Sequence, residues 1–429
     1  MFQRRKLKTK SNLEASVFAL VCLTSLPVCA VPYGSSDARS QAMGETGVAS
    51  AENPNIAQQN PALIAAYPQR KHRGENQRII FPAFSAKISN NVLDLIDIDD
   101  FDYESELTLA IDNFNNGQAV DDVLDVLNPL SDDLESAASA PIFADVQTGL
   151  VITIPDSREG GALQLNRRVV LDGKVDYNTV DESLVASYIE ELTFISNGGA
   201  PQTLHPELYL NGQLIDPTDG FTSSFTAAAL EFSEMALSMA WQLEIFDTEM
   251  MIGFTPKWVS VTSYEYSATA TSNDITERGE LDNGENFNFD LGWAHRIDDK
   301  LTVGVAIKNL VPKEYKTESG NFLEIRPQIR VGSEYQSAYG TFTLDLDLAK
   351  NKALANGDPS QEIGFGAEWR LGKHRLRAGI HKNIAGSGDN ASFAYSLGLR
   401  LRVLGMFTDV SVGAHNNQQS AAIQFGIRF

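Results

Sequence analysis

Apolar residues occupy every second position in several segments of the C-terminal half of the chain. The segment 301–311 reads LTVGVAIKNLV, 341–348 reads TFTLDLDL, and 395–403 reads YSLGLRLRV. A period of two places the apolar side chains of a strand on one face. Such a face belongs either to the interior of a soluble sandwich or to the lipid-facing wall of a membrane barrel.

The lengths of the connections separate these two architectures. Fourteen candidate strands begin near residues 78, 144, 161, 226, 249, 284, 300, 325, 339, 361, 374, 391, 405 and 419. Short connections, such as DT at 247–248 and GK at 372–373, follow the even-numbered strands, whereas the long stretches 89–143, 172–225, 272–283, 312–324 and 351–360 follow odd-numbered ones. Short turns on one side, long loops on the other and an even strand count are typical of outer-membrane barrels. The sequence therefore predicts an all-β fold, a transmembrane antiparallel β-barrel over 78–429.

Composition narrows the function classes. The chain has 429 residues, of which 43% are hydrophobic, and a formal net charge of -22. This acidic balance excludes a general nucleic-acid binder, because phosphate backbones require clustered Lys and Arg. Beyond the first thirty residues, no apolar run approaches the roughly 18–20 residues that a membrane helix needs. A helical membrane protein is therefore excluded, while a barrel is not.

Residues 1–30 have the organisation of a cleaved secretion signal. A basic start (Arg4 to Lys10) precedes the apolar core Val17–Leu26, and Pro27-Val28-Cys29-Ala30 offers small residues for cleavage after Ala30. A lipoprotein signal acylated at Cys29 is the alternative, which the bulky Val28 before that cysteine disfavours. Both cysteines of the chain lie in this segment. The mature chain is thus expected to have no disulfide, no CxxC redox site and no cysteine metal site.

Small residues dominate the segment that follows, and we expect residues 31–77 to form a hatch inside the barrel. Glycine and alanine allow close approach of backbone to backbone, and Asn-Pro marks a turn. The run ARSQAMGETGVASAENPNIAQQNPA resembles the N-terminal hatch of the FadL-like outer-membrane transporters. A floppy N-terminal arm is the alternative. The candidate hatch residues are Arg39, Gly44, Gly47, Asn60, Pro61 and Ala62.

Two long insertions interrupt the barrel pattern. Residues 89–143 contain many Asp and Glu but no Lys or Arg, and apolar residues from Val120 to Leu134 recur at helical spacing. Residues 172–225 form the second insertion, in which Ser183–Phe194 is a helix candidate. The acidic run 97–104 offers carboxylates to a hard cation. A solvated acidic surface is the favoured interpretation, because the run lacks the glycine turn and spaced glutamate of a calcium loop.

Charged residues lie opposite the apolar faces of the late strands. If the apolar face meets lipid, these charges point into the lumen, because a lipid-facing Arg is costly near the membrane midplane. One interpretation is an anion-attracting pathway, and the favoured one is an internal lattice of ion pairs that fills the barrel and holds the hatch. On the same basis, Arg at Leu344 or Leu399 should impair assembly, and Arg at Gly398 should be tolerated better unless packing there is tight. The candidate lumen residues are Arg326, Arg330, Glu334, Asp345, Asp347, Glu368, Arg375, Arg377, Arg400, Arg402 and Arg428.

Motifs of catalysis are missing from the mature sequence. HExxH, GxSxG, the P-loop and GxGxxG do not occur, and the six histidines show no ligand spacing. A barrel hydrolase with a Ser–His pair stays as an alternative, because such pairs are assembled by geometry rather than spacing. We therefore expect a protein that is not an enzyme and has no catalytic residue, metal or cofactor.

The mature chain as a whole resembles the bacterial TraF-like conjugal transfer family, within the FadL-like barrel superfamily. The resemblance rests on Asp37–Ala62, on the acidic stretch NNVLDLIDIDDFDYESELTLAIDNFNNGQ, and on the strand-rich tail, whose last strand ends in Phe429. It implies an exported protein in the outer membrane of a Gram-negative bacterium, with a surface or conjugation-associated role. Passive transport of hydrophobic or amphipathic small molecules is the alternative. The implied partners are membrane lipid, lipopolysaccharide, the barrel-assembly machinery, and either surface partners or a small molecule.

Overall fold

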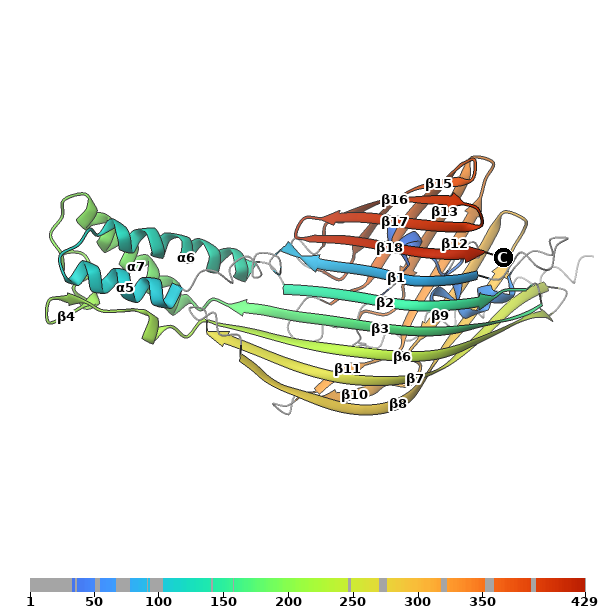
Figure 1. Cartoon of the computed structure of the whole chain (residues 1–429), viewed down its shortest axis with the longest axis horizontal. Coiled ribbons are helices and arrows are strands. Elements are labelled where there is room, and N and C mark those ends of the chain that lie inside the picture. The colour runs from blue at the N-terminus through green and yellow to red at the C-terminus, as the bar shows by residue number, and fades with distance from the viewer. Residues whose placement is uncertain are drawn as a thin grey trace, which may run out of the picture.

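The computed structural model describes residues 33–34, 37–50, 55–66, 78–90, 92, 103–139, 142–156, 158–245, 248–269, 276–317, 322–351, 359–386 and 391–428. Fourteen antiparallel strands close into a barrel, in the order β1-β18-β17-β16-β15-β14-β13-β12-β9-β8-β7-β6-β3-β2 (Figure 1). The strands are β1 (Arg78–Ser89), β2 (Ile142–Ile154), β3 (Glu159–Asp176), β6 (Ser224–Ile245), β7 (Thr248–Thr269), β8 (Thr276–Arg296), β9 (Leu301–Lys308), β12 (Gln328–Gln336), β13 (Gly340–Asp347), β14 (Glu362–Leu371), β15 (His374–Asn383), β16 (Phe393–Val403), β17 (Met406–His415) and β18 (Gln418–Arg428). The predicted fold class is thus confirmed.

The first and last strands complete the barrel. Arg78 pairs with Arg428 and Ser89 with Gln418, while the other edge of β1 pairs with β2. The ring of pairing therefore leaves no open edge, which protects the backbone from pairing with other chains. Phe429, the aromatic end predicted for the last strand, lies outside the described residues.

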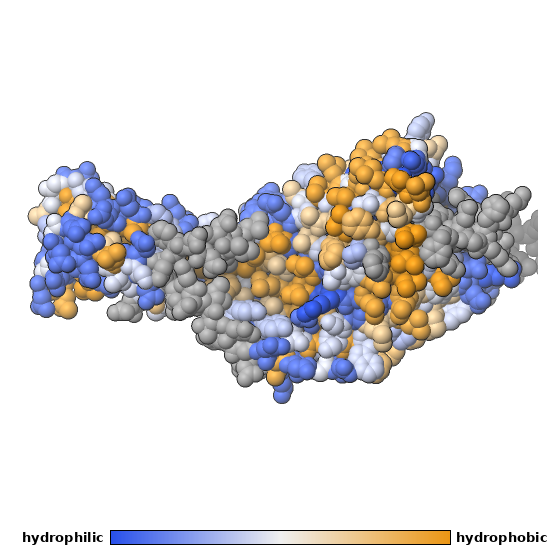
Figure 2. Space-filling view, viewed as in Figure 1, coloured by the Kyte–Doolittle hydropathy of each residue, from blue (hydrophilic) through white to orange (hydrophobic). Residues whose placement is uncertain are grey.

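The pleat of the strands separates two chemistries. In β16, Leu397, Leu399 and Leu401 are exposed on the outer face, whereas Ser396 and Arg400 are buried on the inner face. The same alternation holds in β13 and β18. Figure 2 shows apolar side chains gathered over the barrel. Because successive side chains of a strand point to opposite faces, the local sequence pattern is enough to produce an apolar exterior and a polar lumen.

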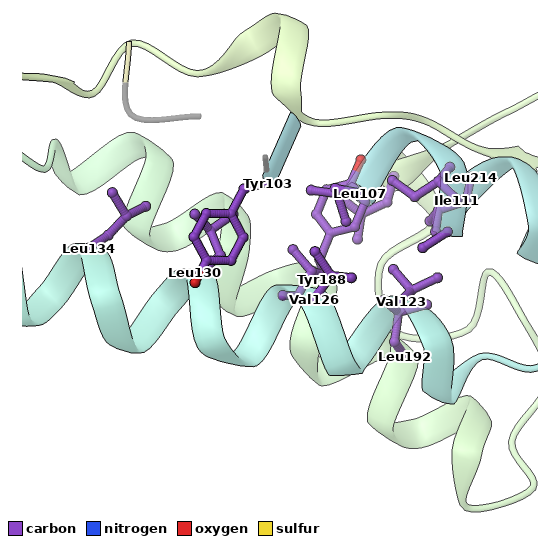
Figure 3. Close-up of a cluster of buried hydrophobic side chains, with 13 residues drawn as sticks. Tyr103, Leu107, Ile111, Val123, Val126, Leu130, Leu134, Tyr188, Leu192 and Leu214 are labelled. Carbon is purple, nitrogen blue, oxygen red and sulfur yellow. The ribbon is translucent and has the colours of Figure 1, made fainter. Parts of the chain in front are cut away.

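A helical cap lies beyond one end of the barrel (Figure 1). It comprises α5 (Tyr103–Asn115), α6 (Asp121–Ser139) and α7 (Thr179–Ser196), with the short hairpin β4 (Tyr209–Leu210) and β5 (Gln213–Leu214) and the 3₁₀ turns η3 (Pro206–Leu208) and η4 (Thr218–Gly220). Both predicted helical insertions contribute to it. Their apolar faces meet in one cluster, which includes Leu107, Val123, Leu127, Tyr188 and Leu192 (Figure 3).

Some predicted connections were wrong. The stretch 272–283 was expected to be a loop, but β8 begins at Thr276, because β7 and β8 continue their pairing past two irregularities of register. The stretch 312–324 contains the hairpin β10 (Lys313–Lys316) and β11 (Phe322–Ile325). The second insertion is shorter than 172–225, since β3 extends to Asp176 and β6 begins at Ser224. These segments are rich in polar residues, so they lack the alternation of apolar and polar residues from which a strand is predicted.

The described part of the hatch contains three short elements. They are α2 (Ala38–Ala42), α3 (Ile56–Gln59) and the 3₁₀ helix η1 (Pro61–Ala65). The described hatch residues are almost all buried within the barrel, toward the end opposite the cap (Figure 1). Among the described residues, no helix combines the length and apolar character needed to cross a membrane.

Candidate functional site

The hatch passes through the lumen as compact, capped turns. Asp37 begins α2 by accepting hydrogen bonds from the backbone N–H groups of Arg39 and Ser40. Asn60 does the same for η1 by accepting from the N–H of Ala62, and Pro61 follows at the first helical position. Capping residues and proline at these positions satisfy or remove N–H groups that a short helix leaves unpaired. The sequence therefore specifies the turns of the hatch locally.

Glycines on the inner face of the barrel make room for the hatch. A Cβ atom on Gly379 would overlap the backbone nitrogen of Gly44, and one on Gly364 would overlap the Gly44 carbonyl oxygen. A Cβ on Gly292 would overlap the side-chain oxygen of Asn60. Gly44 itself has a φ of 67°, which favours glycine. The wall and the hatch thus fit backbone against backbone.

One buried ion-pair network joins the hatch to β14–β17. The Nε of Arg39 lies 3.3 Å from Glu368 Oε2, and the same oxygen accepts from Arg377 Nε at 2.7 Å. Arg377 Nη1 donates to Asp409 Oδ1 at 2.7 Å, and Arg400 donates to both oxygens of Asp409. All five side chains are nearly inaccessible to solvent. Charges buried to this degree are tolerated chiefly when they are paired.

A second network holds the middle of the hatch. Arg330 donates to both oxygens of Asp347 and to the backbone oxygen of Glu45. Asp345 accepts from the N–H groups of Gly47 and Val48, at 2.8 and 3.0 Å. The carboxylate of Glu45 lies 2.8 Å from Lys87 Nζ. The hatch therefore donates hydrogen bonds to a carboxylate of the wall and accepts one from a guanidinium of the wall, and its own carboxylate pairs with an ammonium group of the wall.

The remaining predicted lumen residues occupy different places. Glu334 accepts from Ser50 of the hatch and lies 3.9 Å from Arg39. Arg375 lies 3.9 Å from Glu368, and Arg402 is half-buried on the inner face of β16. Arg326 lies outside both networks and pairs with Glu324 of β11. The side chain of Arg428 is outside the described part of the chain.

Sequence reasoning missed several charged members of the lumen. Lys87 and Asp409 were not singled out, nor was Lys257, which lies between Glu234 (3.3 Å) and Asp290 (3.0 Å). Each stands at an inward-facing position of its strand, so the parity of the alternation carried the signal. The lumen residues predicted from the sequence came only from the strands whose apolar face is clearest.

Apolar packing holds the last described part of the hatch, residues 56–66. Ile56, Leu63 and Ile64 are fully buried against small or flexible residues of β3 and β6–β8, namely Ala162, Ala240, Met251 and Ala294. Burying a side chain of this size contributes roughly 1.5–3 kcal/mol. The space at this side of the hatch is therefore filled by the protein itself.

The wall of the barrel also brings a serine and a histidine together. Ser392 Oγ lies 2.9 Å from His415 Nε2, which is the spacing of a nucleophile and its base. Among the described contacts, no group orients the other ring nitrogen of His415. No group of three or more His, Cys, Asp or Glu among the described residues is arranged to hold a metal ion.

The cap is stabilised by carboxylates that accept backbone hydrogen bonds. Burial raises the pKa of Asp181, but hydrogen bonds from Ser223 and Thr222 more than offset it, so the pKa lies below its usual value. Burial likewise raises the pKa of Glu191, and the N–H groups of His205 and Leu204 bring it below its usual value. These two side chains tie α7 to the irregular chain that follows it.

A polar cavity of about 90 Å³ borders the hatch. Gly34 and Gln58 of the hatch contribute to its lining, together with inward-facing residues of β2, β3, β6–β9 and β12. It thus occupies a part of the lumen that the hatch does not fill.

Comparison with known proteins finds one matching family and several similar solved structures. The family model described as "F plasmid transfer operon, TraF, protein" matches residues 57–347. No curated protein matches the chain. A mutant of the TodX monoaromatic hydrocarbon channel is 10% identical and covers 91% of this chain and 98% of its own, with a TM-score of 0.48.

Two further solved structures are similar at the same level. A Pseudomonas aeruginosa FadL homologue is 9% identical and covers 94% of this chain and 99% of its own, with a TM-score of 0.48. The Ralstonia pickettii toluene transporter TbuX is 14% identical and covers 92% and 98%, with a TM-score of 0.34. At these identities and TM-scores the similarities assign no ligand, and the barrel architecture rests on the strand pairing of this chain.

Proposed function

We propose, from the premise that the chain belongs to the family described as "F plasmid transfer operon, TraF, protein", that it is an outer-membrane barrel closed by its hatch. Its role is to present the helical cap at the cell surface, where the cap contacts partners of conjugation or of cell-to-cell contact. The resemblance inferred from the sequence is confirmed for the family. The role is our proposal.

The outer face of the barrel supports the membrane location. Large apolar residues are exposed there on strands all around the ring, including Leu163, Leu165, Met235, Leu237, Phe287, Leu344, Phe365, Leu397, Val412 and Phe425. In water, so large an apolar surface would drive association, whereas in a bilayer it matches the hydrocarbon core. A Gram-negative outer membrane is the bilayer in which proteins of this architecture lie.

Cell fractionation tests this location. We expect the protein in the outer-membrane fraction, with faster migration on gels when unheated than when boiled. Recovery of the folded protein from the soluble periplasm would contradict the location, whatever the role of the cap.

The observation that carries the surface role is the contrast between lumen and cap. The hatch is bound to the wall through buried polar contacts, above all the ion pair Arg39–Glu368 and the hydrogen bond from Arg330 to the backbone oxygen of Glu45. The cap has its own apolar core and projects beyond the barrel (Figures 1 and 3). A lumen that holds a firmly bound hatch, and an external cap that has its own apolar core, favour a function outside the membrane over conduction through it.

Removal of the cap tests the role. Asp176 pairs with Ser224, and Ile88 with Ala144, so short turns can replace 177–223 and 89–143 without changing strand register. We expect the capless barrel to assemble and the frequency of plasmid transfer between donor and recipient cells to fall. The matched control is Leu404→Ser, at an exposed turn of the opposite end. Unchanged transfer by an assembled capless barrel would overturn the proposal.

Passive transport is the second candidate, and the cavity beside the hatch favours it. An enzymatic role is not proposed, because the Ser392–His415 pair has no orienting third group among the described contacts. Hydrolysis of an ester probe by the wild type but not by Ser392→Ala would contradict that view.

A further inference from the structure

The connection between β9 and β12 folds into the barrel. Asn309, directly after β9, has a φ of 54°, a left-handed conformation that asparagine adopts more readily than most residues. Its backbone N–H donates to Asp290 on the inner face of β8 at 2.8 Å. Pro312 and Pro327 flank the β10–β11 hairpin and have no N–H to donate, so neither can extend the ladder between β9 and β12. The chain therefore leaves the wall here and turns inward.

Asparagine side chains of β8 hold the backbone of this connection. Asn288 Nδ2 donates to the carbonyl of Val311 at 2.9 Å, and its Oδ1 accepts from the N–H of the same residue at 3.0 Å. Asn283 is paired with Lys316 in the same way, at 3.0 and 2.8 Å. An amide can do this because it presents both a donor and an acceptor. Strand β10 is thus tied to the wall just before its start and at its last residue.

The hairpin covers an apolar patch inside the barrel. The inward side chains of β13 are polar, whereas at the level of the hairpin those of β3, β6 and β7 are apolar. Tyr315 of β10 and Ile325 of β11 pack on them and are themselves buried. Such a patch would be unfavourable in a water-filled lumen, and a hairpin of two four-residue strands is marginal on its own. Each therefore stabilises the other. The patch comprises Val170, Ala228, Leu230, Phe232, Val259 and Val261.

The hairpin and the hatch occupy successive levels of the lumen. Along β8, the connection is bonded to positions between Asn283 and Asp290. The hatch lies against Gly292 and Ala294, which are closer to the β8–β9 turn. That turn is at the end of the barrel opposite the cap (Figure 1). The hairpin therefore lies on the cap side of the hatch.

Little free space remains between the two. The cavity of about 90 Å³ is bordered by Gly34 and Gln58 of the hatch, by Tyr315 and Ile325 of the hairpin, and by the wall. A cavity of this size holds a few water molecules. The hairpin therefore fills lumen space that the hatch leaves open.

We propose that the β10–β11 hairpin is a second restriction of the lumen, in series with the hatch. The hatch fills the lumen toward the end opposite the cap, and the hairpin sets the width of the path on the cap side. Its position is fixed by the asparagines of β8 and by the apolar patch, neither of which involves a hatch residue. The restriction is therefore expected to persist when the hatch is absent. It is independent of the role proposed for the cap.

Conductance across planar bilayers tests the arrangement in series. Three deletion proteins are compared with the full chain: one lacks the hatch (33–66), one lacks the hairpin, and one lacks both. Lys308 pairs with Gln328, so a two-residue Asn-Gly turn can replace 309–327 without changing strand register. We expect deletion of the hairpin alone to leave conductance unchanged, because the hatch still fills the lumen. The double deletion should conduct better than the hatch deletion by about twofold or more, because pore width limits the flow.

Two pairs of substitutions test the attachment of the hairpin without deleting it. In the protein that lacks the hatch, Asn283→Ala with Asn288→Ala removes the hydrogen bonds to the hairpin backbone. Conductance should then rise toward that of the double deletion. The matched control is Gln147→Ala with Asn166→Ala, which removes two inward-facing amides whose described hydrogen bonds go to other partners.

Each outcome decides the question. Equal conductance of the hatch deletion and the double deletion would overturn the restriction by the hairpin. A hairpin deletion that alone conducts as well as the double deletion would overturn the arrangement in series. An equal rise in the two substitution pairs would show that the asparagines do not hold the hairpin. Assembly of each protein is checked by the gel shift between unheated and boiled samples, and if the double deletion does not assemble, the substitution pairs decide.

Discussion

At the scale of single residues, Asp409 is the carboxylate on which the lumen network depends most. It accepts hydrogen bonds from Arg377, Arg400 and Gln424, and it is fully buried. We expect Asp409→Ala to lower the free energy of unfolding by roughly 3–5 kcal/mol, because it leaves two buried guanidinium groups short of a counter-charge. Urea unfolding in detergent micelles measures the loss.

The control for this substitution is Asp299→Ala. Asp299 is exposed in the β8–β9 turn, where a change away from any buried contact stays within about 0.5 kcal/mol. Equal stabilities of the two variants would show that the buried network contributes nothing to the folded barrel.

Gly379 tests the fit between wall and hatch. The atoms that a Cβ at this position would meet belong to Met43 and Gly44 of the hatch. We therefore expect Gly379→Ala to destabilise the full chain by about 1–3 kcal/mol. The same change in a chain lacking residues 33–66 should have little effect, because the clash is gone.

The matched control is Gly161→Ala, whose Cβ would meet only an ordinary van der Waals contact. If Gly379→Ala destabilised both backgrounds equally, the hatch would not occupy this part of the lumen.

At the scale of elements, the attachment of α7 should depend on pH. The folded pKa values of Asp181 and Glu191 lie below their usual values, so their stabilising contribution is present above the unfolded pKa, about 4. It is lost as the pH falls through that value toward the folded pKa. We expect amide hydrogen exchange over 179–196, after correction for the intrinsic rate, to lose protection between pH 7 and pH 3.5.

Asp181→Asn should remove part of that dependence, since an amide does not titrate. Glu182→Gln is its control, an exposed neighbour on the first turn of α7. Protection of α7 that stays constant over this pH range would contradict the role given to the two carboxylates.

At the scale of the whole molecule, the barrel and the hatch are separable. All fourteen strands pair with one another without any hatch residue. We expect deletion of residues 33–66 to leave assembly intact and to raise conductance across planar bilayers, because the volume filled by the hatch becomes water. Full-length protein is the reference.

A deletion protein that assembles but conducts no better than the full chain would mean that the lumen is closed by the wall itself. The β10–β11 hairpin, which packs on the inner faces of β6 and β7, is the element that would then be responsible.

Strand number and cap helices could be predicted from the sequence, because both patterns are local. A period of two in 395–403 or 341–348 determines which side chains face outward, whatever the rest of the chain does. The apolar spacing from Val120 to Leu134 likewise produces the buried face of α6. The described hatch elements are locally encoded by Asp37, Asn60 and Pro61.

What meets inside the barrel could not be predicted, because closure joins residues that are far apart in the chain. Asp345 and the backbone N–H of Gly47 are 298 positions apart, and no local pattern relates them. Gly398 shows the same limit. The sequence placed it on the polar face and predicted that Arg would be tolerated there better than at Leu399. That prediction held only if packing at Gly398 is loose, and the packing is tight, because a Cβ at Gly398 would overlap Ala42. The alternation determined which face each residue takes, and only the closed barrel decided what each face meets.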